Sequence, residues 1–254
     1  MGGNMIIDAG GYLGNYPYRK LSISSAGSLG ESASALGVTH MVVSSIDAVF
    51  YKDASQGNDM LIEMLKEKAA VTFIPFCVVN PTYPGWREDA ERAILKQCFK
   101  GFELCPGYHR YKLNDDYGCK VLSLAEKLNV PVRVSNGFED RLQRSHMDIF
   151  EESSPEELID AVKRFPSVKF LLIGFMSNDL AWRIDNNAYL DFSRLDVFEG
   201  IINTMKGLLC SPKISSFLNN RFLVRHNKLY HRNLDLGKSV LDAVSLQRSC
   251  RSFA

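Results

Sequence analysis

The chain has 254 residues, of which 46% are hydrophobic and 23% charged, and its mean hydropathy is −0.10. This composition excludes a disordered chain, a collagen-like repeat and a coiled coil, and the length suffices for a sizeable hydrophobic core. The 30 Lys and Arg residues nearly cancel the 29 Asp and Glu residues, so no overall field attracts nucleic acid or an anionic membrane.

The N-terminal segment MGGNMIIDAGG has neither the basic nor the apolar region of a signal peptide. No apolar stretch approaches the ~18 residues that a membrane span needs. The six cysteines lie far apart without a C-x-x-C pair, which favours reduced thiols over disulfides or a zinc site. We therefore expect a cytoplasmic protein without a nucleic-acid or membrane partner.

Short apolar runs alternate with longer segments of helical character, which is typical of a parallel sheet covered by helices. The strands predicted in chain order are Met5–Asp8, His40–Ser44, Thr72–Asn80, Gly101–Cys105, Pro131–Asn136, Val168–Gly174, Ala188–Ser193 and Arg221–His226. The helices predicted between them are Ala26–Leu36, Gln56–Lys68, Gly85–Gln97, Asp115–Leu128, Pro155–Phe165, Leu195–Leu209 and Leu234–Leu246. Eight such units in about 250 residues predict an α/β fold, a (β/α)8 TIM barrel, as a single domain over residues 1–254.

A doubly wound open sheet is the alternative fold. It is disfavoured because the glycine-rich segment after the first strand, Gly10–Gly14, does not spell the phosphate-binding motif G-x-G-x-x-G.

Segments spread along the chain resemble those of a known family. Its members open with a strand ending in I-D-x-H-x-H-x-G, and Ile6–Gly14 reads IIDAGGYLG. Further similar segments follow in the same order: Val78–Pro81, Gly85-Trp86, Phe99–Pro106, Leu128–Val132, Phe165–Phe170 and Asn219–Val224. From Met5 to about Leu246 the chain resembles the amidohydrolase-related metal-dependent hydrolases, a TIM-barrel branch of the amidohydrolase superfamily. The resemblance implies the same barrel, with zinc or another divalent metal as the cofactor that the family would use.

The metal ligands of that family do not align with metal-binding side chains here. The resemblance places the H-x-H pair, the histidines of the fifth and sixth strands and the final aspartate on Gly10, Tyr12, Ser135, Gly174 and Asn227. A shift of one residue would place His226 at the last position, and the family's H-P pair reads Cys105-Pro106. Zinc needs three or four converging imidazole, thiolate or carboxylate groups, so we predict no metal cofactor.

Side chains alternate between the two faces of a strand, so the ligand positions predict what else faces the barrel interior. Glu103 would point inward with Cys105, and Arg133 with Ser135; Asp8 and Arg225 would do so on the first and last strands. Neighbouring strands would then bring Glu103 to Arg133 and Asp8 to Arg225. We expect these ion pairs to fill the space of a metal centre, either merely holding the core in register or leaving a guanidinium to bind an anion.

Two functions from different classes stay open. The first is a barrel without metal-dependent hydrolase activity that binds a small anionic molecule at its mouth. The candidate binding residues are Asp8, Tyr12, Glu103, Cys105, His109, Arg133, Ser135, Asn136, Arg225 and Asn227. The alternative is an active hydrolase or decarboxylase of small molecules. It would use His226 as the catalytic base, or a metal held by Glu103, Cys105, Asp191 and His226.

Two further expectations concern the residues after the fourth strand and self-association. Tyr108 and His109 follow the fourth strand and would hang over the barrel mouth, where a partly exposed histidine can act as a general base. The barrel would also be able to form a homo-oligomer, leaving its mouth as a docking surface.

Overall fold

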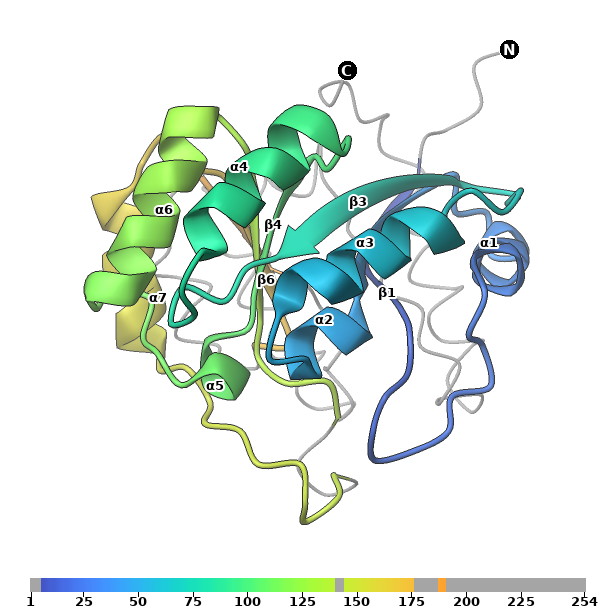
Figure 1. Ribbon diagram of the computed structural model, residues 1–254, viewed down its shortest axis with the longest axis horizontal. Helices are drawn as coiled ribbons and strands as arrows, with labels where there is room; N and C mark the ends of the chain where they lie inside the picture. Colours follow the sequence, from blue (N-terminus) through green and yellow to red (C-terminus); the bar gives the residue numbers. More distant parts are fainter. Residues whose placement is uncertain (1–5, 140–143, 176–186, 191–254) are drawn as a thin grey trace, which may run out of the picture.

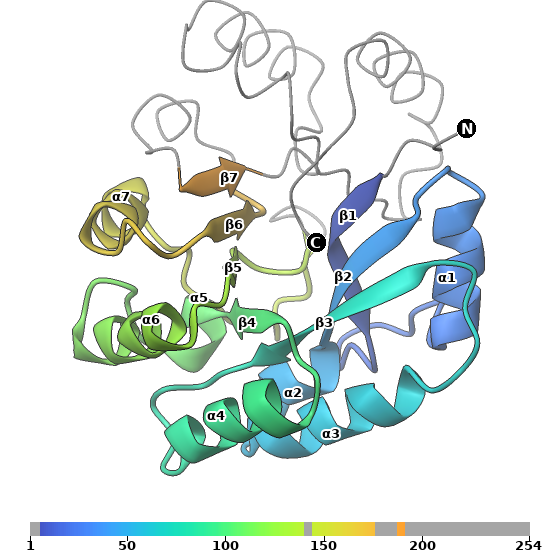
Figure 2. The ribbon, with the colours of Figure 1, turned by 90° about the horizontal axis from the view of Figure 1, so that it is seen from above.

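The computed structural model describes residues 6–139, 144–175 and 187–190. Within these ranges, seven strands form one sheet in the order of the chain, and each pairs in parallel with the next. The strands are β1 (Ile7–Leu13), β2 (His40–Ser45), β3 (Thr72–Val78), β4 (Gly101–Leu104), β5 (Val132–Ser135), β6 (Phe170–Ile173) and β7 (Ala188–Leu190). Seen from above, the sheet curls around a centre with the longer helices outside it (Figure 2).

The longer helices cover the outer face of the curled sheet (Figure 1). In chain order, the helices of the described residues are α1 (Ala26–Ser34), α2 (Ile46–Phe50), α3 (Ala54–Met64), α4 (Trp86–Lys96), α5 (Pro106–His109), α6 (Asp116–Leu128) and α7 (Pro155–Arg164). A parallel sheet curled in chain order inside a layer of helices is the predicted TIM-barrel architecture. None of the helices among the described residues is both long and apolar enough to cross a membrane.

Strands β2 to β7 and the five longer helices confirm the predicted elements, with ends that differ by a few residues. Helix α3 begins two residues before the prediction, because the side chain of Asp53 accepts a hydrogen bond from Ser55 N and caps the helix there. The short helices α2 and α5 were not predicted, since four or five residues are too few to show a helical period. The strand predicted at Arg221–His226 and the helices at Leu195–Leu209 and Leu234–Leu246 lie outside the described residues.

The first strand differs from its prediction. It runs through the Gly10-Gly11 pair to Leu13, and its register with β2 shifts between Asp8 and Gly11. A side chain at position 11 would place its Cβ 2.6 Å from Sδ of Met41, so only glycine allows this close approach of β1 to β2. The irregularity interrupts the alternation of faces, so the inward direction of Asp8 does not follow from that of Gly10.

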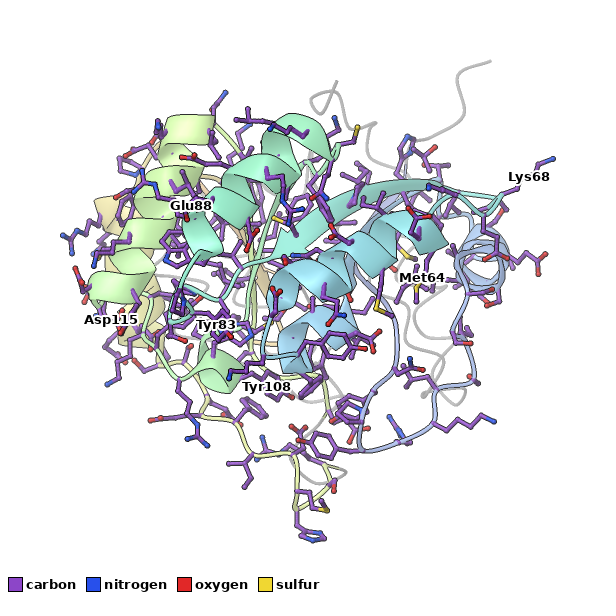
Figure 3. All side chains as sticks on the ribbon, viewed as in Figure 1. Met64, Lys68, Tyr83, Glu88, Tyr108 and Asp115 are labelled. Carbon is purple, nitrogen blue, oxygen red and sulfur yellow. The ribbon has the colours of Figure 1, made fainter. Side chains whose placement is uncertain are left out.

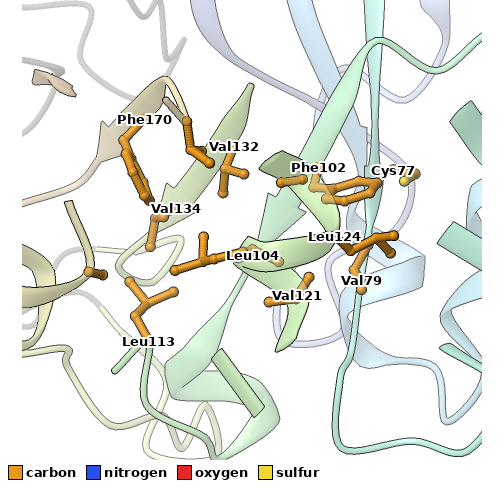
Figure 4. Packing of buried hydrophobic residues seen from close by; sticks show 14 of the residues in the cluster. Cys77, Val79, Phe102, Leu104, Leu113, Val121, Leu124, Val132, Val134 and Phe170 are labelled. Atoms are coloured by element: carbon orange, nitrogen blue, oxygen red, sulfur yellow. The ribbon is translucent and has the colours of Figure 1, made fainter. Parts of the chain in front are cut away.

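Successive residues of β4 and β5 point alternately to the outer core and to the barrel interior. Phe102, Leu104, Val132 and Val134 belong to the large apolar cluster that also contains residues of α6 and α7 (Figure 4). The intervening residues therefore point to the other face of the sheet, as predicted. On the interior face of the sheet, a separate apolar cluster contains Val42, Phe76, Leu171 and Tyr189.

Candidate functional site

An ion pair between Arg133 and Glu103 occupies the barrel interior. The two residues face each other across β5 and β4, and neither side chain is exposed to solvent. Nε of Arg133 donates to Oε2 of Glu103, and Nη1 donates to the carbonyl oxygens of Ala9 (2.7 Å), Val42 (3.2 Å) and Gly11 (3.3 Å). Arg133 thus connects β5 with β4, β1 and β2 across the interior, and the predicted Glu103–Arg133 pair is confirmed.

Aromatic rings flank the guanidinium of Arg133. Its Cζ atom lies 4.4 Å from the ring centroid of Tyr12 and 6.0 Å from that of Phe76. Burial is the largest single effect and lowers the pKa of Arg133, but the Glu103 carboxylate together with Tyr12 and Cys105 outweighs it, and the pKa is raised. Arg133 therefore stays protonated, and the Glu103 carboxylate balances its charge within the barrel interior.

The Glu103 carboxylate is the acceptor on which the neighbouring donors converge. The Tyr12 hydroxyl donates to Oε1 at 2.9 Å, and the Cys105 thiol lies 3.5 Å from the same oxygen. Because Tyr12 uses its proton on Glu103, Ser135 must donate to Tyr12 in the hydrogen bond between their hydroxyls. Burial and the nearby Glu103 carboxylate raise the pKa of Cys105, so this thiol stays protonated.

These groups do not fit a divalent metal ion. Both oxygens of Glu103 already accept hydrogen bonds from Arg133, Tyr12 or Cys105, and the guanidinium charge repels a second cation. Cys105 is a thiol rather than a thiolate. Gly174, which the resemblance aligns with the family's sixth-strand histidine, has φ of 78°, in the left-handed region that residues with a Cβ atom rarely adopt. Among the described residues, no three His, Cys, Asp or Glu side chains are grouped so that they could hold a metal.

The remaining predicted site residues fall into two groups. Asp8 is buried, and its Oδ1 accepts a hydrogen bond from Gly10 N at 2.8 Å. Asn136 follows β5, and its Oδ1 accepts from Ser153 N at 3.1 Å, which ties two parts of the β5–α7 connection together. Arg225, His226, Asn227 and Asp191 lie outside the described residues, so the Asp8–Arg225 pair and the His226 base stay predictions.

The expected placement of His109 is wrong. The residue closes α5 and is only 7% exposed, with Nε2 3.1 Å from the carbonyl oxygen of Val49. Burial lowers the pKa of His109 to about 4, which leaves the imidazole neutral at physiological pH. Pro106 begins a short helix at this point, and this helix turns the ring toward α2 instead of over the barrel mouth.

Sequence reasoning placed Tyr108 at the barrel mouth but missed the aromatic layer to which it belongs, on the side where the strands end. We call the mouth layer the rings of Tyr16, Tyr18, Phe50, Tyr108, Phe138 and Phe150. Figure 3 shows Tyr108 at α5, in the lower half of the molecule in that view. Phe138 packs edge-on against Tyr12 with 4.9 Å between ring centroids, so the mouth layer adjoins the Arg133–Glu103 centre. The available signal was the recurrence of Tyr and Phe after the first, second, fourth and fifth strands.

Comparisons with solved structures show the same fold. A 2,6-dihydroxybenzoate decarboxylase complexed with 2,6-dihydroxybenzoate gives a TM-score of 0.62 at 15% identity, covering 96% of this chain and 93% of that one. A dihydroxybenzoic acid decarboxylase from Polaromonas sp. JS666, with bound manganese and 2-nitroresorcinol, gives 0.61 at 14% identity, covering 95% and 91%. The 5-carboxyvanillate decarboxylase of Sphingomonas paucimobilis gives 0.57 at 12% identity, covering 80% and 84%.

A search by sequence against curated proteins found no match. A family model described as amidohydrolase, in contrast, matches residues 20–180, which is more than half of the chain. This segment contains the ion pair, its Cys105 and Ser135 neighbours and the helices from α1 to α7. The chain belongs to the amidohydrolase family.

Proposed function

We propose that this member of the amidohydrolase family has no metal-dependent hydrolase activity and binds a small carboxylate at the barrel centre. The observation that carries the proposal is the buried Arg133–Glu103 pair. Arg133 is permanently cationic, and the Glu103 oxygens beside it already accept hydrogen bonds. A metal centre at this place would need free ligands instead.

The binding part of the proposal rests on the remaining hydrogen-bonding capacity of Arg133. Its Nη2 atom is buried and has no hydrogen-bond acceptor among the described residues. Leaving a buried donor unsatisfied costs about 1–3 kcal/mol, and more when the group is charged. A ligand carboxylate would supply the missing acceptor, and a guanidinium is well suited to recognise it. The similar solved structures include one complexed with 2,6-dihydroxybenzoate, which supports an aromatic carboxylate as the probe.

A thermal-shift series tests carboxylate binding with two ligands that differ in one group. 2,6-Dihydroxybenzoate should raise the melting temperature by roughly 5–10 °C at a concentration about a hundredfold above its Kd. Resorcinol has the same ring and hydroxyls without the carboxylate and should produce no shift. Equal shifts from both compounds would contradict recognition of the carboxylate by a cation.

Elemental analysis of the purified protein tests the metal part. We expect no stoichiometric zinc or manganese, and no loss of stability when EDTA is added. Near-stoichiometric metal that EDTA removes, with a fall in melting temperature, would overturn this part of the proposal.

Catalysis is the second candidate function, because the solved structures similar over the length of the chain include decarboxylases of aromatic acids. Incubation with 2,6-dihydroxybenzoate, with and without MnCl2, would reveal it as formation of resorcinol and carbon dioxide. Turnover that depends on MnCl2 would favour this candidate and contradict the first.

We also propose that the protein forms a homo-oligomer. Size-exclusion chromatography with light scattering measures its molar mass in solution.

A further inference from the structure

The mouth layer brings together three parts of the chain that lie at the ends of different strands. Tyr16 belongs to the β1–α1 connection, Tyr108 to α5, and Phe138 and Phe150 to the β5–α7 connection. Ring centroids in the layer are 5.1–6.1 Å apart, and Phe138 stacks with Tyr108, which stacks with Phe150. Side chains from these connections therefore fill the space beside Tyr12, on the way to the barrel centre.

A single carboxylate oxygen joins these three parts. Oδ2 of Asp148 accepts hydrogen bonds from the hydroxyls of Tyr16 (2.6 Å) and Tyr108 (3.1 Å), and the residue is 2% exposed. Burial raises the pKa of both phenols, and the hydrogen bond to Asp148 adds to the effect, so both stay protonated donors. An ion pair between Arg19 and Glu139 connects the β1–α1 and β5–α7 connections a second time.

The segment 144–152 packs tightly against the end of β5 and against α5. The Phe150 ring lies where a side chain at Gly137 would be, and Gly137 has φ of 80°, so glycine is needed there on both counts. Glu151 N also donates to the carbonyl oxygen of Gly107 in α5 at 3.3 Å. The closed position is therefore a defined contact with α5 and the end of β5.

Little else in the segment favours closure. Met147 and Ile149, on either side of Asp148, are 63% and 75% exposed. Oδ1 of Asp148 is buried without a hydrogen-bond partner among the described residues, which is costly for a carboxylate. Opening would hydrate this oxygen, so closure depends on the two phenol hydrogen bonds, the packing of Phe150 and the hydrogen bond from Glu151 N to Gly107.

We propose that residues 144–152 form a lid over the barrel mouth and that Asp148 is its latch, held by Tyr16 and Tyr108. The lid controls entry to the barrel centre. Control of entry rests on the proposed function, whereas the latch itself does not depend on which ligand enters.

Hydrogen–deuterium exchange of the ligand-free protein tests the latch. Tyr16→Phe keeps the ring and removes one hydrogen bond, and Asp148→Ala removes both. Amides of residues 144–152 should exchange faster in both variants, on the order of tenfold in Asp148→Ala. Tyr18→Phe is the matched control, because it removes a hydroxyl from the same layer without a bond to Asp148, and its exchange should equal that of the wild type.

Exchange in β4 and β5 reports whether each variant keeps its fold, and it should be unchanged throughout. Wild-type exchange of residues 144–152 in Asp148→Ala would overturn the latch. Equal acceleration in Tyr18→Phe would also overturn it, because the layer as a whole would then hold the segment.

Stopped-flow binding of 2,6-dihydroxybenzoate tests the control of entry. The association rate should rise in Tyr16→Phe by about the factor seen in exchange. An unchanged association rate beside faster exchange would show that the segment does not control entry. Failure of every variant and the wild type to bind would count against the proposed function, and the exchange data would still decide the latch.

Discussion

Arg133 and Glu103 face each other on neighbouring strands with neither side chain exposed to solvent. Removing one partner leaves the other as an uncompensated buried charge, which costs about 3–5 kcal/mol. We therefore expect Glu103→Leu and Arg133→Met each to lower the free energy of unfolding by an amount of this order. Urea unfolding followed by circular dichroism measures it.

The double variant Glu103→Leu with Arg133→Met distinguishes the cost of leaving one buried charge unpaired from the cost of burying the pair itself. Apolar replacement of both members of a buried pair is often neutral or stabilising, so it should recover much of the loss from the single changes. Lys120→Met is a matched control at the exposed Lys120–Asp116 pair and should cause no measurable loss. Strictly additive effects of the two single changes would show that the buried residues are not coupled.

His109 provides a prediction on the pH dependence of stability. Its folded-state pKa is about 4, below the usual 6.5, because burial disfavours the charged ring. The unfolded chain therefore binds this proton more readily, and stability should fall as the pH decreases from about 6.5 to about 4. The loss approaches roughly 3 kcal/mol. Urea unfolding at pH 7.5 and pH 4.5 measures the difference, which His109→Gln should reduce; an NMR titration point of His109 near 6.5 would contradict the assignment.

The ion pair could be predicted from the sequence because it follows from short-range regularities. The strands β4 and β5 are regular and adjacent, so the alternation of faces brings Glu103 and Arg133 to the same side and the same level. The same reasoning fails on β1, where the close approach of Gly11 to β2 permits a shift of register. Strand alternation is thus informative only where no irregularity intervenes.

The mouth layer could not be predicted, because its contacts depend on the paths of connections between elements. Nothing in the spacing of Tyr16 and Asp148, which lie 132 residues apart, indicates that they share a hydrogen bond. His109 illustrates the same limit, since its direction depends on the short helix α5. Loop conformation is determined by tertiary contacts that leave no periodic signal in the sequence.

A serine side chain caps the N-terminus of α7. Ser154 precedes Pro155 at the first helical position, and Ser154 Oγ accepts a hydrogen bond from Glu157 N at 3.2 Å. Ser154→Ala should lower the free energy of unfolding by about 1 kcal/mol, whereas Ser154→Asp should keep the cap and most of the stability. Equal losses in the two variants, measured by urea unfolding, would contradict a capping role.

The backbone conformation of Gly174 disfavours a histidine at this position. The resemblance aligns the family's sixth-strand histidine with this residue, yet its φ of 78° lies in the left-handed region. A residue with a Cβ atom in that conformation costs roughly 1–2 kcal/mol, so Gly174→His should destabilise the fold before any metal is considered. Gly174→Ala should show a similar backbone cost, and Gly174→Asn a smaller one, because asparagine tolerates this region better. Thermal unfolding of the three variants decides the matter: if Asn and Ala cost the same, side-chain crowding rather than backbone conformation excludes the family's histidine.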